Sequence, residues 1–346
     1  MKNSIPILYL HRVNEIDPPH LALTPNAFRE LLKFLQQNNY KTLKPNELIA
    51  ALEGKCQYRN PVVLSFDDGY KDNYLFAHPI LKQFGMHGIV FVITKYIQER
   101  EDEDKEILPF TPTNINAVKK SPCFKQFLTW SQIREMENEK TLFCHSHSHS
   151  HRQVFVNGRV DGIYSHTNPH WGIYSIEGFD VPENNFMELK RCSALAKPAF
   201  FPDLEHFKKL NSRLEYYDYN QEKFFKEVER EGKLQIKGKI EAPNDFSTRI
   251  RKDLLKSKKI IEEKLQKKCL HFCWPWGQSC IESQNIALDL GFKAIYTTQT
   301  GPNSDEMALK SLNRYQVRKV NPLILKLSLL VRKYSILARI YRYLKK

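Results

Sequence analysis

Short apolar runs alternate with amphipathic stretches along the first part of the chain. Runs rich in β-branched and aromatic side chains predict buried strands at residues 5–10 and 61–66. Between them, the Thr24-Pro25 cap and apolar positions at helical spacing up to Leu35 predict a helix, and residues 45–52 repeat the pattern. The chain therefore begins in the order strand, helix, helix, strand.

The alternation continues on both sides of an irregular middle region. The expected elements, in chain order, are a helix at 75–84, a strand at 88–94, a helix at 131–139, a strand at 142–144, a helix at 248–267, a strand at 270–274, a helix at 282–290 and a strand at 294–298. Helices between successive strands predict a parallel α/β architecture.

The irregular region, at about residues 155–245, is rich in aromatic side chains. We expect it to be an inserted subdomain or a long active-site loop within a domain of residues 1–320. Some of its rings could stack on sugars or form the core of a small lid. These side chains include Tyr164, His166, His170, Trp171 and Tyr174.

Residues 322–346 carry seven basic side chains and no acidic one. One apolar face at helical spacing contains Leu323, Leu327, Leu330, Tyr334, Leu337 and Tyr341. We expect residues 321–346 to form a basic amphipathic helix. It could lie flat on an anionic bilayer or pack on the preceding domain with its basic face solvated. Its charges make a membrane-spanning helix a poor interpretation.

Composition narrows the class of protein. With 41% hydrophobic and 27% charged residues among 346, the chain is typical of a globular protein and not of a disordered or multi-span membrane protein. A net charge of +14 favours an anionic partner, but no nucleic-acid-binding module is recognisable, so we do not expect nucleic acid. Seven scattered cysteines without a Cys-x-x-Cys pair, and an N-terminal apolar stretch too short for a signal peptide, favour the cytoplasm.

Two adjacent carboxylates follow the predicted strand at 61–66, in Ser65-Phe66-Asp67-Asp68-Gly69. Neighbouring negative charges repel and raise one pKa, and a bound cation relieves that cost. A surface Asp-Asp-Gly turn is the simpler interpretation of the tripeptide alone. The strand before it and a histidine tract further along favour a functional site.

That tract alternates histidine with serine directly after the predicted strand at 142–144. Its imidazoles belong to His145, His147, His149 and His151. A loose metal-scavenging tract, a solvated loop and a continued strand are alternatives. Two histidines and one carboxylate with an open position form a recurrent catalytic metal set, which lowers the pKa of bound water to about 7. One aspartate could then bind the metal while its neighbour acts as general base.

With these residues in view, the chain resembles the polysaccharide deacetylases of the NodB-homology class, carbohydrate esterase family 4. Residues 65–70 are similar to the first family motif, which implies Asp67 as catalytic base and Asp68 as metal ligand. The tract is similar to the second motif, His-Ser/Thr-x-x-His, whose histidines bind metal. Two registers fit, His145 with His149 or His147 with His151, and the strand and small residue before His145 favour the first.

Residues 272–277 are similar to the family's aromatic-Pro-aromatic-Gly motif, which implies substrate contacts for Trp274, Pro275 and Trp276. A core strand that ends in a proline turn is the alternative. Many relatives place an arginine two positions before this proline to orient the base aspartate. Cys273 stands there instead, and Arg314, which we count with the substrate-binding residues, could take over that role.

Residues 8–13 resemble the N-terminal Tyr-His segment of relatives whose last motif is permuted to the front, where the histidine is the candidate general acid. The resemblance thus implies that His11 protonates the leaving amine. His11 would follow the first barrel strand, and the carboxyl ends of parallel strands gather at one mouth. A histidine satisfied within the core is the alternative. The motifs cover residues 5–154 and 248–320 and leave the middle region unexplained.

The resemblance implies a distorted (β/α) barrel of about seven parallel strands and a hydrolase that uses a divalent metal ion, with zinc expected. The implied substrate is an N-acylated amino sugar of a surface glycan or of its nucleotide- or lipid-linked precursor. We expect a cytoplasmic enzyme that could contact the anionic inner membrane peripherally. A catalytically inactive glycan-binding protein on the same fold is the alternative, which the Cys273 departure permits.

Overall fold

Parallel strands form the main sheet of this computed structural model, which describes residues 3–19, 21–99, 126–164, 176–179, 186–216, 220, 222–224, 226, 235–318 and 320–344. Seven strands lie on one path in the order β13-β12-β7-β6-β5-β1-β14, with β4 beside β5. Their bounds are β1 (Ile7–Leu10), β4 (Lys41–Thr42), β5 (Pro61–Phe66), β6 (Gly88–Val92), β7 (Leu142–Ser146), β12 (His271–Cys273), β13 (Ala294–Tyr296) and β14 (Tyr315–Gln316). Every pair within the sheet is parallel, and the predicted distorted barrel is confirmed as a half-barrel of seven such strands.

Both faces of this sheet are buried, which explains why its strands are continuous apolar runs. In β5, Val62, Leu64 and Phe66 belong to the large cluster that also contains the helices' apolar side chains. Val63 points to the opposite face and joins Ile7, Ile89 and Phe91 in a second cluster inside the barrel.

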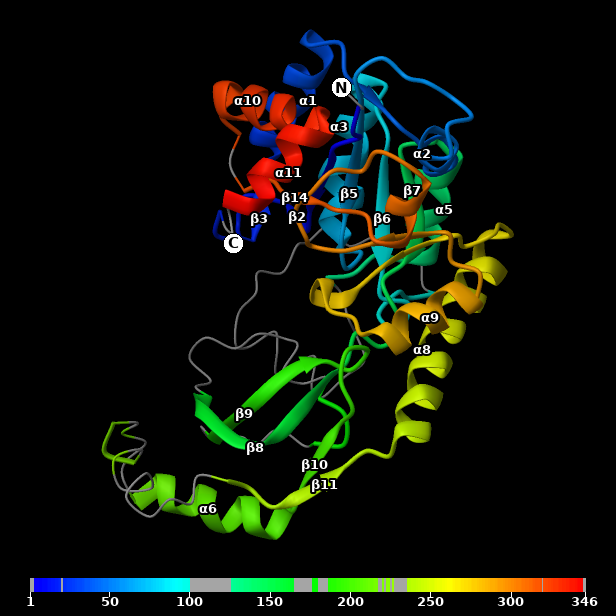
Figure 1. Cartoon of the computed structure of the whole chain (residues 1–346). Helices are drawn as coiled ribbons and strands as arrows, with labels where there is room; N and C mark the ends of the chain where they lie inside the picture. The colour runs from blue at the N-terminus through cyan, green and yellow to red at the C-terminus, as the bar shows by residue number, and fades with distance from the viewer. Residues whose placement is uncertain are drawn as a thin grey trace.

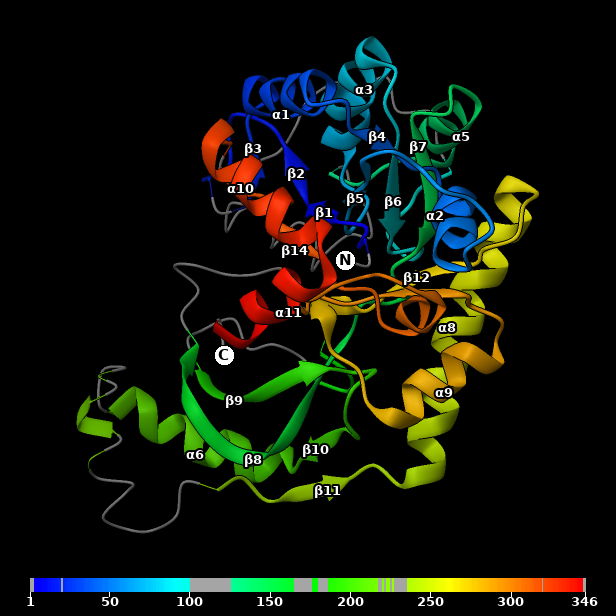
Figure 2. The same cartoon turned by 45° about the horizontal axis from the view of Figure 1, so that its top comes forward.

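Helices surround the sheet in the positions that the sequence predicts (Figures 1 and 2). They are α1 (Pro25–Gln37), α2 (Pro45–Leu52), α3 (His78–Phe84), α5 (Trp130–Asn138), α8 (Pro243–Leu265) and α9 (Ile281–Asp289). The Thr24 side chain caps α1 by accepting a hydrogen bond from the Ala27 amide at 3.1 Å. A π-helical turn, η1 (Asn73–Ala77), precedes α3 where the sequence predicts one uniform helix.

A second, antiparallel sheet lies apart from the barrel (Figure 1). Its order is β11-β10-β8-β9, with bounds β8 (Gln153–Tyr164), β9 (Phe186–Ser193), β10 (Phe200–Pro202) and β11 (Gly238–Ile240). It has its own apolar cluster, to which α6 (Leu204–Tyr216) contributes Phe207. Tyr164 is buried there with its ring 5.0 Å from Phe186, so this tyrosine is a core residue and not a sugar platform. The predicted rings His166, His170, Trp171 and Tyr174 lie outside the described residues.

The C-terminal stretch, predicted as one helix, forms two: α10 (Pro322–Lys333) and α11 (Ser335–Leu344). The prediction of a single helix is wrong because Tyr334 adopts an extended backbone, with φ −109° and ψ 123°, and forms a bridge to Asn3. Within the described ranges, no helix combines the length and apolarity needed to cross a bilayer.

A buried polar pair lies inside the barrel, below its mouth. The rings of His145 and His271 are 4.6 Å apart, and Nδ1 of His271 lies 2.8 Å from the Tyr296 hydroxyl. Burial, assisted by the charge of Lys267, lowers the pKa of His271 to about 3. This imidazole is therefore neutral in the folded protein at neutral and mildly acidic pH.

His271 should make the fold acid-sensitive. Because the unfolded imidazole takes up a proton near pH 6.5 and the folded one does not until about pH 3, its contribution to stability is complete above pH 6.5 and is lost as the pH falls. The loss approaches about 1.4 kcal/mol per pH unit. His271→Asn retains a polar partner for Tyr296, and urea unfolding between pH 7.5 and 5 should show a smaller pH slope by up to one proton. An unchanged slope would contradict this.

Candidate active site

A strained turn at the end of β5 places two carboxylates in the barrel mouth. Asp68 and Gly69 both adopt left-handed backbone, with φ of 74° and 79°. A Cβ on Gly69 would lie 2.9 Å from Cγ1 of Val92, so only glycine fits without a shift. Asp67 and Asp68 are both buried. Left-handed backbone at a non-glycine residue is costly, and such strain is concentrated at functional sites.

Asp67 is paired with a fully buried arginine. The two terminal nitrogens of Arg314 donate to Oδ1 and Oδ2 of Asp67 at 2.7 and 2.8 Å, and its Nε donates to the Thr297 carbonyl at 2.8 Å. Burial raises the pKa of Asp67, but the charge and hydrogen bonds of Arg314 outweigh it, so the pKa is lowered. Asp67 is thus an oriented, ionised carboxylate. The hypothesis that Arg314 replaces the arginine missing at Cys273 agrees with this geometry.

Asp68 faces two imidazoles. Its Oδ1 lies 3.3 Å from Nε2 of His147 and 3.5 Å from Nε2 of His151, and a ligand atom of each of the three residues lies within 4.8 Å of the others. Burial raises the pKa of Asp68, but the His147 hydrogen bond and the charge of His151 outweigh it, so the net shift is downward. This is a compact, buried set of one oxygen and two nitrogen donors.

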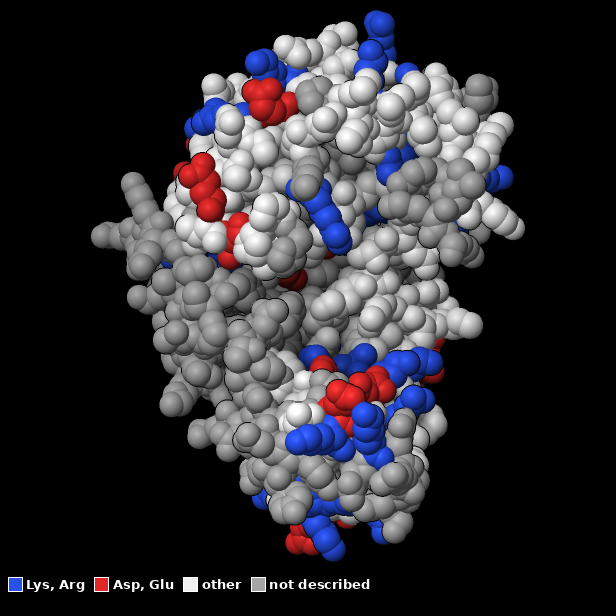
Figure 3. Space-filling model, turned by 90° about the vertical axis from the view of Figure 1, so that its left-hand side faces the viewer, with Lys and Arg blue, Asp and Glu red and all other residues white. Residues whose placement is uncertain are grey.

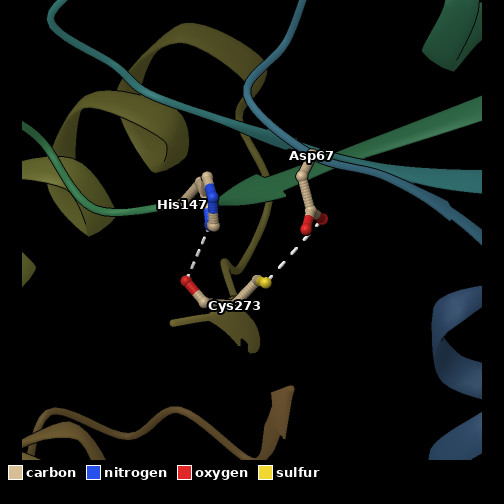
Figure 4. Close-up of side chains that lie close together, drawn as sticks. All are labelled: Asp67, His147 and Cys273. Atoms are coloured by element: carbon tan, nitrogen blue, oxygen red, sulfur yellow. Dashed lines mark hydrogen bonds between the residues drawn. The ribbon is translucent and has the colours of Figure 1, made fainter. Parts of the chain in front are cut away.

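The hydrogen bonding of His147 suits a metal ligand (Figure 4). Nδ1 of His147 lies 2.9 Å from the Cys273 carbonyl, which can only accept, so Nδ1 carries the hydrogen. Nε2 then faces Asp68 at 3.3 Å, and a proton or a cation must lie between these two atoms. Burial lowers the pKa of His147, but Cys273 and the hydrogen bond to Asp68 outweigh it and raise the pKa, so a proton holds the position that a cation could take. The same figure shows the Cys273 thiol pointing toward Asp67; its sulfur lies 3.7 Å from Oδ1. The residues present therefore fit a divalent cation.

The structure brings together the second histidine register and not the favoured one. His145 is still inside β7, opposite Phe91, and stacks near His271 about 6–7 Å below the level of His147. His149 points away from the mouth, with Nδ1 2.9 Å from the Thr94 hydroxyl. The preference for His145 and His149 is therefore corrected, because β7 extends two residues further than predicted and moves the ligands beyond Ser146.

The loop after β7 owes its shape to a residue that the sequence analysis missed. Asp253 of α8 accepts hydrogen bonds from the amides of His149 and Ser150, at 2.8 and 3.0 Å. Ser148 and His151 adopt left-handed backbone, with φ of 72° and 50°, which turns His151 back toward Asp68. In the sequence Asp253 is one of four acidic residues within a basic helix, and nothing marks it as a partner of the tract.

A pocket opens above these groups. Its lining combines expected residues with several that the sequence analysis missed: Tyr9, His11, Arg12, Leu21, Asp67, Asp68, Tyr70, His147, His151, Trp276, Gly277, Thr298 and Gln316. His11 is in this wall, as predicted, with its ring 5.8 Å from that of Tyr9. Tyr9, Arg12, Tyr70 and Gly277 lie within the motifs at residues 8–13, 65–70 and 272–277 but were given no role there, whereas Leu21, Thr298 and Gln316 lie outside these motifs.

Only one of the residues of the aromatic motif that were predicted to contact substrate lines this pocket. The Trp276 ring lies 4.0 Å from that of His151. Trp274 is buried 4.7 Å from Phe272, and Pro275 is buried as well. The expectation that Trp274 and Pro275 contact substrate is not supported, because successive residues of a strand point to opposite faces and Trp274 faces the helices. Arg314 likewise contacts Asp67 and does not line the pocket.

Comparisons with known proteins agree with this geometry. The polysaccharide deacetylase family model matches residues 54–170. YxkH of Bacillus subtilis (strain 168), whose name includes the words polysaccharide deacetylase, is 35% identical over 108 residues, 30% of this chain and 38% of that protein. The poly-beta-1,6-N-acetyl-D-glucosamine N-deacetylase of Escherichia coli (strain K12) is 21% identical over 292 residues, 82% of this chain and 32% of that protein. The matches span about a third of these relatives' length.

A solved structure extends the similarity to the fold. The de-N-acetylase from Aggregatibacter actinomycetemcomitans superimposes with a TM-score of 0.61 at 18% identity, covering 94% of this chain and 99% of that one. The family match over residues 54–170, the relatives and the parallel half-barrel agree: this chain is similar in sequence and in fold to polysaccharide deacetylases.

Proposed function

We propose that the chain is a metal-dependent hydrolase that removes the N-acetyl group from an amino sugar of a surface glycan or of its lipid- or nucleotide-linked precursor. The observation that carries the proposal is the Asp68, His147 and His151 donor set beside an ionised Asp67 in one pocket. The Escherichia coli relative named as an N-deacetylase of poly-β-1,6-N-acetylglucosamine supports an N-acetylated glycan as the substrate class.

Asp68, His147 and His151 would hold a divalent cation, with zinc expected from two imidazoles and one carboxylate. When bound there, the cation would polarise the acyl carbonyl and lower the pKa of a water molecule. The Cys273 carbonyl keeps His147 in the tautomer that this role requires.

Asp67 would accept the proton of the attacking water. Arg314 engages one side of each carboxylate oxygen, so Asp67 cannot rotate and keeps its remaining lone pairs for the mouth. His11, across the pocket, would donate a proton to the leaving amine. Trp276, which is partly exposed in the pocket, offers aromatic surface on which a sugar ring could stack.

Arg314 also bears on the inactive glycan-binding alternative. That alternative rests on Cys273, which stands where relatives carry an orienting arginine. Since Arg314 reaches the base aspartate with both terminal nitrogens, the charge that Cys273 lacks is supplied from the β14 side of the barrel. The geometry therefore supports an active hydrolase. The six cysteines that the structure describes are free, in keeping with the proposed cytoplasmic location.

Replacing each of the two aspartates in turn should distinguish the role of Asp67 from that of Asp68. Asp68→Asn should lose the metal and the activity together, whereas Asp67→Asn should keep the metal and lower kcat by about 10²–10⁴-fold, because only the general base is lost. Metal content by atomic emission and acetate release from N-acetylglucosamine oligosaccharides give the two readouts. Equal metal retention in both variants would overturn the division of roles.

The histidine register gives a matched pair of variants. His151→Ala should reduce zinc affinity by at least tenfold and abolish acetate release, while His149→Ala should leave both within about twofold, because His149 faces Thr94. Isothermal titration with zinc and a deacetylation assay measure both effects. If His149→Ala lost the metal and His151→Ala kept it, the assignment would be reversed.

Arg314→Lys should lower kcat by about tenfold or more with little change in zinc content. Lysine keeps the charge but replaces the two-pronged contact with Asp67 by a single flexible ammonium. Arg332→Lys, at another buried arginine whose guanidinium packs on the Tyr315 ring, is the control for general damage. An unchanged kcat in Arg314→Lys would remove the positioning role.

A further inference from the structure

The outer face of the C-terminal hairpin, which we define as α10 and α11, is unusually apolar. Half of the fourteen large hydrophobic residues that are exposed in the described part of the chain belong to it. They are Leu323, Ile324, Leu327 and Leu330 on α10, and Ile336, Ile340 and Tyr343 on α11. Their exposed fractions range from 48% to 85%, and on each helix they follow helical spacing.

The opposite face fixes the hairpin to the barrel. Leu325 and Leu329 are buried in the main apolar cluster, and the Arg332 guanidinium lies 3.7 Å from the centre of the Tyr315 ring. The Lys333 carbonyl accepts a hydrogen bond from the Ser4 amide at 2.7 Å. The seven exposed residues, which we call the apolar stripe, thus form a second apolar face on helices whose inner face is already packed on the barrel. The packing of the barrel does not require this second face.

Charge selects among possible partners for this face. Lys326, Arg339 and Arg342 are exposed beside the stripe, and no aspartate or glutamate occurs after Glu306. A second copy of the chain would bring the same positive charges against this surface. Anionic phospholipid headgroups complement the basic residues, and the acyl-chain boundary accommodates the apolar stripe. Figure 3 shows the corresponding side of the molecule, whose upper half is mainly uncharged, with scattered basic side chains and a few acidic ones toward its left edge.

The hairpin also lies beside the pocket. Its first helix follows β14, whose Gln316 lines the pocket, and Arg332 rests on the neighbouring Tyr315. On the second helix, Arg342 donates to the side chain of Gln299, next to the lining residue Thr298. A surface that binds the hairpin would therefore also lie close to the pocket.

We propose that the C-terminal hairpin binds the surface of an anionic lipid bilayer, with its apolar stripe inserted at the headgroup boundary and its basic residues on the phosphates. The helices lie in the plane of the bilayer. Combined with the proposed function, on which this extension rests, the hairpin favours N-acetylated glycans attached to membrane lipids over free oligosaccharides.

Vesicle sedimentation with the full chain tests the membrane contact. Binding to vesicles of phosphatidylcholine and phosphatidylglycerol at 1:1 should exceed binding to pure phosphatidylcholine by at least tenfold. Leu327→Glu with Ile340→Glu should reduce it by at least tenfold, because two charges enter the stripe. Ile281→Glu with Met307→Glu removes apolar side chains elsewhere that are even more exposed, and this variant should bind as the parent does.

A variant that lacks two basic side chains tests the contribution of charge to vesicle binding. Lys326→Gln with Arg339→Gln leaves the stripe intact and should bring binding down toward the level seen with pure phosphatidylcholine. Equal binding by the parent and the Leu327→Glu/Ile340→Glu variant would overturn the proposal, as would no binding to anionic vesicles. A parent dimer that this variant dissociates, seen by light scattering without vesicle binding, would assign the face to a second copy.

Activity assays distinguish a failure of the membrane-binding proposal from a failure of the proposed hydrolase function. The Leu327→Glu/Ile340→Glu variant should lose at least tenfold in acetate release from an N-acetylated glycolipid in anionic vesicles and nothing from a soluble oligosaccharide. Asp68→Asn should lose both activities while binding vesicles normally. Equal rates of the parent and the hairpin variant on glycolipid would contradict the substrate class, whatever the vesicle binding.

Discussion

Two adjacent buried carboxylates each need a positive charge, and the site is arranged around that need. Asp67 receives the Arg314 guanidinium, and Asp68 faces two imidazole nitrogens at 3.3 and 3.5 Å. Neighbouring charges would otherwise raise one pKa. Because the two solutions differ, the carboxylates suit the two roles that we propose, Asp67 as a fixed base and Asp68 as a metal ligand. A left-handed turn at Asp68 and Gly69 points the neighbours at different partners.

Parallel strand order explains how distant segments reach this pair. The carboxyl ends of β1, β5, β7 and β12 open on one mouth, so His11, Asp67 and His147 meet without any local sequence contact. The alternation of apolar runs and amphipathic stretches predicted the helices around the barrel and six of the eight strands in its sheet; β4 and β14, of two residues each, are too short to form an apolar run. The pair Asp67-Asp68 could be identified as a candidate site from the sequence because adjacent carboxylates repel each other unless a cation lies between them. The histidine tract could be identified because imidazoles are common metal ligands.

The other features of the site and fold depended on backbone geometry, which could not be predicted from the residue types. Four histidines at alternate positions are equivalent in sequence, and only the last residue of β7, Ser146, decides which pair leaves the sheet. Trp274 and Trp276 differ by two positions, yet one is core and the other lines the pocket. The strands of the second sheet pair across long stretches of sequence, and no motif marks them. Tyr334, whose extended backbone separates the two C-terminal helices, has no neighbouring proline or glycine from which the break could be predicted.

The account stands on a cation held between Asp68, His147 and His151. A crystal grown with zinc and measured on both sides of the zinc absorption edge locates the ion directly. The account predicts one strong anomalous peak within about 2.3 Å of the Asp68 carboxylate and the two imidazole nitrogens. A peak at His145 or His149, or an active protein in which these three side chains share no ion, would contradict it.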